Sequence, residues 1–205
     1  MTKNELIKAF EKPLPGEAAR QNLSHSNRLN FSHNSPPKES AVAILLYEKN
    51  GELHCLLTQR TENKHDKHSG QISFPGGSKD DSDLNHTETA IRECYEEIGI
   101  RICKNDIVGK LSELYIPVSN FNVQPFVAFL NNAPTDFNLQ KSEVAEIIEV
   151  PISHLLNPEN LKEKQLTRNQ EQITVPYYDF NSKHIWGATA MMLSELLSLV
   201  MNYKL

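Results

Sequence analysis

The chain has 205 residues and a formal net charge of −5 at pH 7. This length is typical of one domain, and the acidic balance argues against nucleic acid as a partner, because domains that bind it usually carry a basic stripe. No apolar run reaches membrane-spanning length, and the polar N-terminus does not resemble a secretory signal. Three cysteines without C-x-x-C spacing suggest neither a disulfide framework nor a cysteine zinc site. We therefore expect a cytoplasmic protein that binds no membrane.

The N-terminal part of the chain is polar up to residue 40. Leu6, Phe10 and Leu14 recur there at spacings of four, which predicts a short helix, and Asn, Ser and Pro are frequent after it. We expect residues 1–40 to form an N-terminal extension made of this helix and a polar loop. Residues 41–205 then form the main domain.

The main domain alternates apolar runs with turn residues. A short strand near residues 72–74 precedes the pair Gly76 and Gly77, and the next helix ends at Gly99, a residue suited to a left-handed C-terminal cap. We expect strands at residues 41–47, 53–58, 107–115, 123–130, 145–150 and 174–180, and helices at residues 84–98 and 187–201. Elements in this order predict an α/β fold, an α/β/α sandwich with a mixed β-sheet.

The helix over residues 84–98 carries a cluster of carboxylates. On a helical wheel Glu93, Glu96 and Glu97 fall within one arc of roughly 100°. The opposite arc holds the apolar side chains of Leu84, Ile91, Cys94, Tyr95 and Ile98. A charge run is most often a solvated face, but here only Arg92 relieves the repulsion, and a glycine turn precedes the helix. Hard divalent cations take oxygen ligands, so the cluster favours a site for Mg²⁺ or Mn²⁺.

The same residues resemble a known motif. Gly77, Asp83 and residues 92–100, which read R-E-C-Y-E-E-I-G-I, resemble the box of the Nudix hydrolases, G-x5-E-x7-R-E-U-x-E-E-x-G-U with U apolar. The second half matches at every specified position. In the first half Asp83 stands where Glu is usual, and the spacer to Arg92 is one residue longer.

The resemblance implies roles for these residues. Glu93, Glu96 and Glu97 would hold the metal ions, aided by the carbonyl of Gly77, and Arg92 would orient the glutamates. A further glutamate from a later loop often completes such a site or activates water. Glu143 or Glu146 could supply it, although an acidic loop is more often only solvated.

Four other segments resemble the coenzyme A pyrophosphatase branch of the family. They are residues 56–60 (L-L-T-Q-R), 68–77 (H-S-G-Q-I-S-F-P-G-G), 118–127 (V-S-N-F-N-V-Q-P-F-V) and 184–190 (H-I-W-G-A-T-A). The resemblance implies that Arg60, His68, Gln71 and Phe74 bind substrate. Alternatively, His68 orients the backbone, Phe74 shapes the turn, and Arg60, Lys64 and Lys67 form a solvated patch. The side chains of Ile185, Trp186 and Met192 are expected in the core.

The branch resemblance implies a reaction. We expect hydrolysis of the diphosphate bridge of coenzyme A or an acyl-coenzyme A, yielding 3′,5′-ADP and 4′-phosphopantetheine or its acyl form. Glu93 or Glu143 would take a proton from the attacking water. The alternatives are hydrolysis of another nucleoside diphosphate derivative, such as ADP-ribose or a dinucleotide, and a non-catalytic module that binds a nucleotide. The expected partner is a small molecule, and a homodimer is left open.

Overall fold

The computed structural model describes residues 1–24, 32–63, 68–168 and 171–204. Its helices are α1 (Lys3–Phe10), α2 (Gly16–Arg20), α3 (His86–Ile98), α4 (Ile152–Leu156) and α5 (Gly187–Lys204), with 3₁₀ turns η1 (Gln21–Leu23), η2 (Lys104–Asp106) and η3 (Pro158–Asn160). Its strands are β1 (Lys38–Lys49), β2 (Glu52–Arg60), β3 (Ile72–Ser73), β4 (Gly76–Ser78), β5 (Ile107–Lys110), β6 (Leu114–Ile116), β7 (Phe121–Leu130), β8 (Val144–Pro151), β9 (Leu161–Arg168), β10 (Glu171–Phe180) and β11 (Lys183–Trp186). In the described part of the chain, the helices are too short or too polar to span a membrane.

The main sheet is mixed, as the sequence predicts. Its central path runs β3, β2, β1, β7 and β5, while β4 pairs with β1, β6 with β7, and β8 with β2. β1 and β7 are parallel over ten residue pairs, and the other pairings are antiparallel. The strands β9, β10 and β11 form a second, antiparallel sheet.

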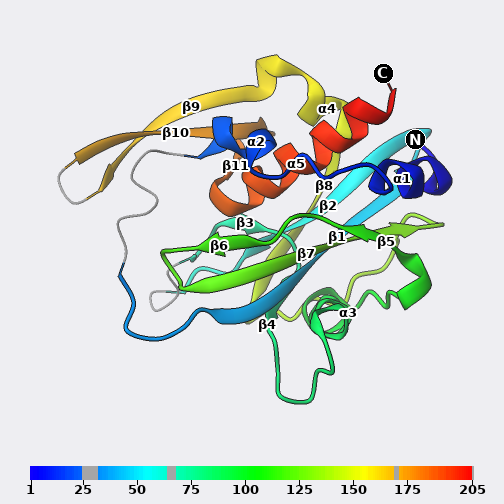
Figure 1. Cartoon of the computed structure of the whole chain (residues 1–205), viewed down its shortest axis with the longest axis horizontal. Coiled ribbons are helices and arrows are strands. Elements are labelled where there is room, and N and C mark those ends of the chain that lie inside the picture. The colour runs from blue at the N-terminus through cyan, green and yellow to red at the C-terminus, as the bar shows by residue number, and fades with distance from the viewer. Residues whose placement is uncertain (25–31, 64–67, 169–170, 205) are drawn as a thin grey trace.

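Two hydrophobic cores lie on the two faces of the main sheet. Successive side chains of a strand point to opposite faces, and in β1 Ile44 and Leu46 belong to one core whereas Ala43 and Leu45 belong to the other. Figure 1 shows α3 on one side of the sheet and α1, α2 and α5 on the other. The predicted α/β/α sandwich is therefore confirmed.

The extent and apolar face of α3 differ from the prediction. The helix begins at His86, and the side chain of Asn85 caps it by accepting a hydrogen bond from the backbone N–H of Glu88. Leu84 precedes this cap and is 84% exposed, so its place in the apolar stripe was wrong. Tyr95 is 45% exposed because its ring lies against the guanidinium of Arg101 on the surface. Glu97, by contrast, is buried.

The strand predictions also needed correction. Residues 107–115 form two strands, β5 and β6, because the chain leaves the ladder between Lys110 and Leu114. β9 was not predicted, since its sequence L-K-E-K-Q-L-T-R is polar with little alternation. It is a strand because it pairs along its whole length with β10. Tertiary pairing thus overrides a weak local pattern.

The N-terminal segment packs onto the main body. Leu6 and Ala9 of α1 are buried in the core that contains α5. The ring of Phe10 lies so close to β5 that a Cβ atom on Gly109 would be 2.3 Å from it. Arg20 of α2 is buried in an ion pair with Glu195 of α5. Residues 1–24 therefore contribute to the core, and the separation of residues 1–40 from residues 41–205 as an extension stays a prediction.

Candidate active site

The ends of α3 fix the position of its carboxylates. Asn85 caps the N-terminus, and Gly99 ends the helix with a φ of +78°, donating its N–H to the carbonyl of Tyr95. Glycine adopts this left-handed backbone conformation at little steric cost, because it has no Cβ atom. Cys94 and Ile98 are fully buried beneath the helix. This packing turns Glu93 and Glu97 toward β4 and leaves Glu96 largely exposed.

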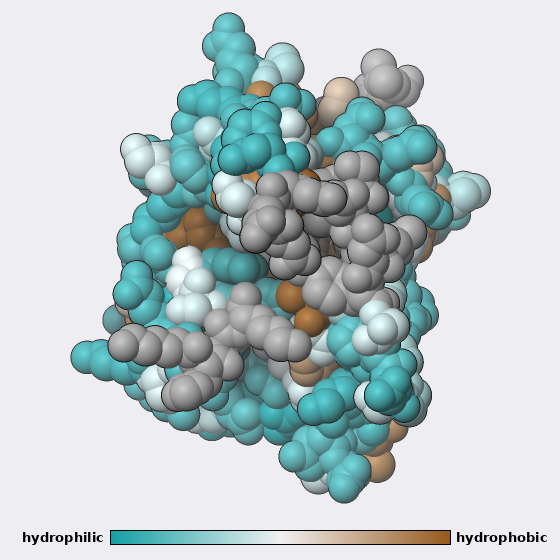
Figure 2. All heavy atoms as spheres, turned by 90° about the vertical axis from the view of Figure 1, so that its left-hand side faces the viewer, coloured by the Kyte–Doolittle hydropathy of each residue, from teal (hydrophilic) through white to brown (hydrophobic). Residues whose placement is uncertain are grey.

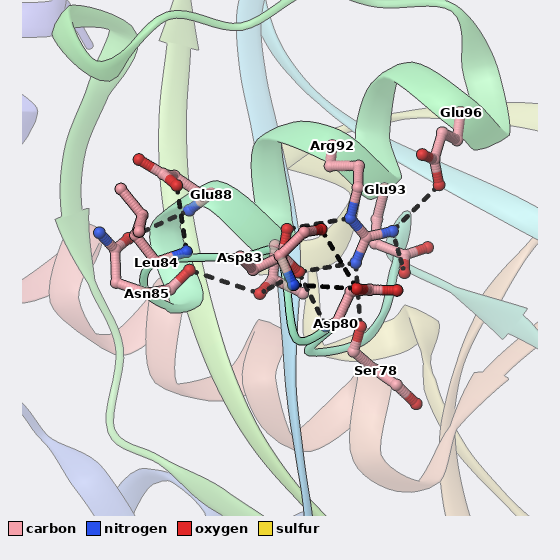
Figure 3. Close-up of polar contacts among 11 residues, drawn as sticks. Ser78, Asp80, Asp83, Leu84, Asn85, Glu88, Arg92, Glu93 and Glu96 are labelled. Atoms are coloured by element: carbon pink, nitrogen blue, oxygen red, sulfur yellow. Dashed lines mark hydrogen bonds and ion pairs between the residues drawn. The ribbon is translucent and has the colours of Figure 1, made fainter.

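Arg92 connects the start of the motif to its carboxylates (Figure 3). Its Nε and Nη2 donate to the two oxygens of Asp83 at 3.0 and 2.8 Å. Its Nη1 donates to Glu93 at 2.8 Å and to Glu96 at 3.0 Å, and Nη2 also donates to the carbonyl of Ser78. The guanidinium therefore holds two glutamates from one side while a bidentate pair fixes its own orientation.

Asp83 is buried and well supplied with donors. It accepts hydrogen bonds from the backbone N–H of Asp80 and from the hydroxyl of Thr89, in addition to those from Arg92. The hydrogen bonds from Arg92 are the main reason that the pKa of Asp83 lies well below its usual range. Although Asp is shorter than the Glu of the usual motif, and the spacer is longer, the carboxylate still reaches Arg92.

Glu93 and Glu97 lie in a desolvated environment. The pKa of Glu97 is raised to about 8, chiefly by burial and also by the neighbouring charges of Glu93 and Glu143. The backbone N–H of Gly76 donates to Glu97 at 3.1 Å and acts in the opposite direction, as does the charge of Arg60. Burial likewise raises the pKa of Glu93, against the effect of Arg92. A bound cation would stabilise the ionised form of these desolvated carboxylates, because it would neutralise their charge.

The two glycines of β4 allow the strand to approach α3 closely. A Cβ atom on Gly77 would lie 2.6 Å from the carboxylate of Glu93. A Cβ atom on Gly76 would lie 2.3 Å from the carbonyl of Ala41 in β1, and Gly76 has a φ of +155°. A larger residue at Gly76 would clash with the backbone of β1, and a larger residue at Gly77 would displace the carboxylate of Glu93. The backbone beside Gly77 is therefore adjacent to the carboxylate cluster, as the motif implies.

The donor set suits a hard cation. Carboxylate and backbone oxygens are the ligands that Mg²⁺ prefers, and Mn²⁺ takes the same type. Within the described residues, no group of three or more His, Cys, Asp and Glu side chains is arranged to hold a metal ion. Glu93 and Glu96 are instead turned to Arg92. The oxygen chemistry and the burial fit a metal site, and the ligand set Glu93, Glu96, Glu97 and Gly77 stays a prediction.

One cavity of about 780 Å³ joins the predicted residues, and its volume is typical of ligand pockets. It is lined by the glutamates of α3, by Gly77, and by all four residues predicted to bind substrate: Arg60, His68, Gln71 and Phe74. The ring of His68 and the amide oxygen of Gln71 lie 3.2 Å apart, and the carbonyl of Gln71 accepts from the N–H of Arg60. Residues 64–67, with Lys64 and Lys67, lie outside the described residues.

The structure distinguishes between Glu143, which lies in the turn before β8, and Glu146, which lies in β8 itself. Glu143 is exposed, lines the cavity, and lies close enough to Glu93 and Glu97 to raise the pKa of both. Glu146 instead forms an ion pair of 2.6 Å with Lys183 and is not among the lining residues. Glu143 is therefore the better placed of the two.

The cavity also has a part that sequence patterns did not indicate. Ile185 and Met192 are buried in the core as expected, whereas Trp186 is only half-buried. Both Trp186 and Met192 line the cavity. Leu23 lines it as well, from the N-terminal segment. The chain offers no local signal for this residue, because its place depends on contacts with α5, more than 160 residues later. The face in Figure 2 is hollowed, and hydrophobic side chains are visible inside the hollow.

Sequence comparisons agree with the motif. A sequence model of the NUDIX domain matches residues 37–174. The mitochondrial coenzyme A diphosphatase NUDT8 of Homo sapiens is 30% identical over 166 residues, which cover 80% of this chain and 70% of that protein. The peroxisomal coenzyme A diphosphatase NUDT7 of Mus musculus is 31% identical over 152 residues, covering 73% and 62%. The uncharacterised Nudix hydrolase NudL of Pectobacterium atrosepticum is 34% identical over 141 residues, covering 69% and 72%.

Solved structures share the fold. The Nudix hydrolase RenU of M. smegmatis aligns with a TM-score of 0.56 at 13% identity, over 87% of this chain and 95% of that one. A C. elegans Ap4A hydrolase aligns with a TM-score of 0.53 at 16% identity, over 80% and 98%. At these identities the likeness concerns the fold alone. The NUDIX match spans more than half of the sequence and includes the carboxylates of α3, and so this chain belongs to the Nudix hydrolase family.

Proposed function

We propose that this enzyme hydrolyses the diphosphate bridge of coenzyme A or an acyl-coenzyme A, with Mg²⁺ or Mn²⁺ as cofactor. The products would be 3′,5′-ADP and 4′-phosphopantetheine or its acyl form. The main supporting observation is that the carboxylates of α3 and the residues of the upstream signature, Arg60, His68, Gln71 and Phe74, line one cavity. The names of the relatives at 30 and 31% identity support the same substrate class.

The glutamates of the site have two roles in this proposal, binding of the cation and acceptance of a proton. Glu93, Glu96 and Glu97 hold the cation, with the carbonyl of Gly77 beside them. When bound, the cation neutralises charge on the diphosphate oxygens and lowers the pKa of water at the site. Glu93 or Glu143 accepts the proton of the attacking water.

Arg92 orients the carboxylates of Glu93 and Glu96. Asp83 fixes the orientation of the guanidinium. The opposite nitrogen of Arg92 can then bond both Glu93 and Glu96, and its positive charge reduces the repulsion between the two carboxylates. Arg60, which lines the cavity and whose charge acts on Glu97, pairs with a phosphate of the substrate, and the planar guanidinium suits such a contact.

Two alternatives differ in what they require. Another nucleoside diphosphate derivative, such as ADP-ribose or a dinucleotide, could use the same carboxylates. A non-catalytic module that binds a nucleotide would not need all of Glu93, Glu96 and Glu97. A homodimer stays a prediction, and so does the cytoplasmic location, since two of the relatives named above are a mitochondrial and a peroxisomal protein.

A substrate panel tests the proposal. The purified chain is incubated with coenzyme A, dephospho-coenzyme A, ADP-ribose and Ap4A in Mg²⁺ or Mn²⁺, and products are separated by chromatography. We expect 3′,5′-ADP from coenzyme A, faster turnover toward alkaline pH, and reversible loss of turnover in EDTA. Preferred cleavage of ADP-ribose or Ap4A would contradict the substrate class. Full turnover in metal-free buffer would contradict the mechanism.

The variant Glu97→Gln tests the metal-binding role directly. It removes a charged oxygen from the site with little change in volume, so we expect turnover of coenzyme A to fall at least about a hundredfold. The matched control is Glu88→Gln, the same change on the same helix. Glu88 pairs with Lys104 and does not line the cavity, so that variant should keep its turnover. Relief of repulsion should leave the metal-free Glu97 variant as stable as the parent or more so.

A further inference from the structure

The cavity has two chemically different ends. The acidic end is formed by α3 and β4 on one side of the main sheet. The other end is apolar and lies where α5, η1 and the second sheet meet, with Leu23, Phe121, Ile173, Trp186, Met191 and Met192 among its lining residues. Because α3 and α5 lie on opposite sides of the sheet (Figure 1), a ligand that fills the cavity must be elongated. With the proposed cation at the carboxylates, such a ligand would carry an anionic group at that end and an apolar group at the other.

The apolar end is lined mainly by carbon and sulfur atoms, and nearby the cavity also contains the buried hydroxyl of Ser119. The hydroxyl of Thr189, which also lines the cavity, already donates to the carbonyl of Ile72 at 2.9 Å. Met191 and Met192 have unbranched side chains that adapt to ligands of different shape. An alkyl chain gains from this surface by leaving water. A polar group would gain less binding free energy there, because it would lose hydrogen bonds to water.

Leu23 forms a fixed part of this wall. It is 2% exposed and ends η1, the turn that follows α2. Arg20 anchors this segment, because its guanidinium bonds the buried carboxylate of Glu195 and the carbonyl of Glu113. The hydroxyl of Ser194 also donates to the carbonyl of Ala19 at 2.6 Å. The N-terminal segment is thereby held against α5 by the side chain of Arg20 and by the backbone of Ala19.

We infer that the apolar end is an acyl-binding subsite, and that Leu23 limits the length of the acyl chain. The inference rests on the proposed function, and it specifies an acyl-coenzyme A rather than free coenzyme A as the better substrate. The diphosphate lies at the acidic end, and the fatty acyl group lies between α5, η1 and the second sheet. The N-terminal segment is then part of the substrate site.

Chain-length kinetics test the subsite. Hydrolysis is measured for coenzyme A and for straight-chain acyl-coenzyme A substrates from acetyl to palmitoyl, below their micellar concentrations. We expect KM to fall with each added methylene, by up to about fourfold for complete burial. KM should rise again once the chain reaches the wall. The value of kcat should change little, since the reacting diphosphate lies at the other end.

Variants of Leu23 test the wall. Leu23→Ala should move the chain of lowest KM to a longer length, and Leu23→Phe should move it to a shorter one. The matched control is Leu6→Ala, an equal truncation at a fully buried residue of α1 that does not line the cavity. It should leave the chain-length profile unchanged. If Leu23→Ala does not fold, the shift in Leu23→Phe decides.

The outcomes separate the inference from the proposed function. If coenzyme A is hydrolysed but KM is the same for all acyl chains, or if Leu23 variants keep the parent profile, the inference alone is overturned. If coenzyme A is not hydrolysed, the proposed function fails. The subsite is then judged by calorimetric titration of the same acyl-coenzyme A series in EDTA. Equal Kd values along the series would overturn it.

Discussion

Two arginines of this protein form ion pairs with buried carboxylates, and they differ in what surrounds them. The pair of Arg92 and Asp83 joins residues nine apart, at the start of the motif helix. The pair of Arg20 and Glu195 joins residues 175 apart, between α2 and α5. Both carboxylates are nearly inaccessible, at 5% and 0% side-chain exposure, but the arginine is 26% exposed in the first pair and 5% in the second.

The remaining contacts of each guanidinium show the difference in role. Arg20 bonds Glu195 and the carbonyls of Ser112 and Glu113, all of which belong to the fold. Arg92 keeps one nitrogen for Glu93 and Glu96, which line the cavity. A similar chemical pair can therefore stabilise the packing of distant segments or orient the groups of a site. Which it does depends on where the spare hydrogen bonds go.

The largest effect is expected for Glu195→Gln. The variant leaves the positive charge of Arg20 buried without a counter-charge, and losing one partner of a buried pair typically costs about 3–5 kcal/mol. We expect the free energy of unfolding to fall by that amount, measured by urea denaturation, while kcat for coenzyme A at low temperature is retained. A loss of kcat in the folded variant would contradict a purely structural role.

A double-mutant cycle provides the control for this pair. Arg20→Met alone leaves the carboxylate of Glu195 buried without its arginine, and the double variant Arg20→Met/Glu195→Gln leaves neither charge. The double variant should therefore lose less stability than the sum of the two single variants, with a coupling free energy of roughly 0.5–3 kcal/mol. Additive losses would show that the pair does not act as a unit.

Asp83→Asn should have the opposite profile. Arg92 is partly exposed and keeps Glu93, Glu96 and the carbonyl of Ser78, so the loss of stability should be smaller than for Glu195→Gln. Turnover should fall about ten- to a hundredfold, as is typical when a residue that orients metal ligands is changed. Asp81→Asn, the same substitution at an exposed position of the same loop, is the control and should keep parental kinetics.

The pH dependence of stability provides a second test of the ion pair that Asp83 forms with Arg92. Its pKa is lowered in the folded protein, so the folded state binds fewer protons than the unfolded state below the usual range of an aspartate. Its contribution to stability is present above that range and is lost as the pH falls toward the folded pKa. In unfolding experiments between about pH 5 and pH 2, the difference between parent and Asp83→Asn should therefore shrink. If the difference in the free energy of unfolding stayed constant over this pH range, the lowered pKa of Asp83 would be contradicted.

The contrast between the two pairs also explains what could be predicted from the sequence. The carboxylate cluster of α3 is local: Glu93, Glu96 and Glu97 lie within five residues, and helical periodicity alone brings them together. Arg60, His68, Gln71 and Phe74 were found only through the family resemblance, yet they line the same cavity.

Other features depend on contacts between distant segments. The pairing of Arg20 with Glu195, the strand β9 and the place of Leu23 have no local pattern, because each is decided by packing against a segment far along the chain. The exposure of Leu84 was missed for a smaller reason: an Asn cap after this residue starts the helix later than hydrophobicity suggested.

Arg60 extends the comparison to a third arginine, one whose partner would be the substrate. It lines the cavity beside Glu97. If it pairs with the 3′-phosphate of coenzyme A, the contact is worth about 1.5–3 kcal/mol, or roughly ten- to a hundredfold in preference over dephospho-coenzyme A. Arg60→Ala should narrow that gap by lowering kcat/KM for coenzyme A alone. Equal losses on both substrates would assign Arg60 to the diphosphate or to the fold.

The smallest effect is expected at Asn85, which places the motif helix without an ion pair. Its side chain accepts a hydrogen bond from the N–H of Glu88 at 3.2 Å, and its extended backbone starts α3. Asn85→Ala removes this acceptor and should lower the free energy of unfolding by about 1 kcal/mol. Asn85→Asp keeps an acceptor and adds a negative charge at the helix N-terminus, so it should be neutral or stabilising.

The two Asn85 variants separate helix stability from the site. Glu93 and Glu97 lie two turns or more beyond the cap, and Gly99 and the buried Cys94 and Ile98 hold that part of the helix independently. Both variants should therefore keep kcat close to the parent, although they differ in stability when measured by urea denaturation. If Asn85→Ala lowers kcat as strongly as Asp83→Asn does, the start of α3 and the orientation of Arg92 form one unit. The distinction between supporting a helix and orienting its carboxylates would then not hold for this end of the site.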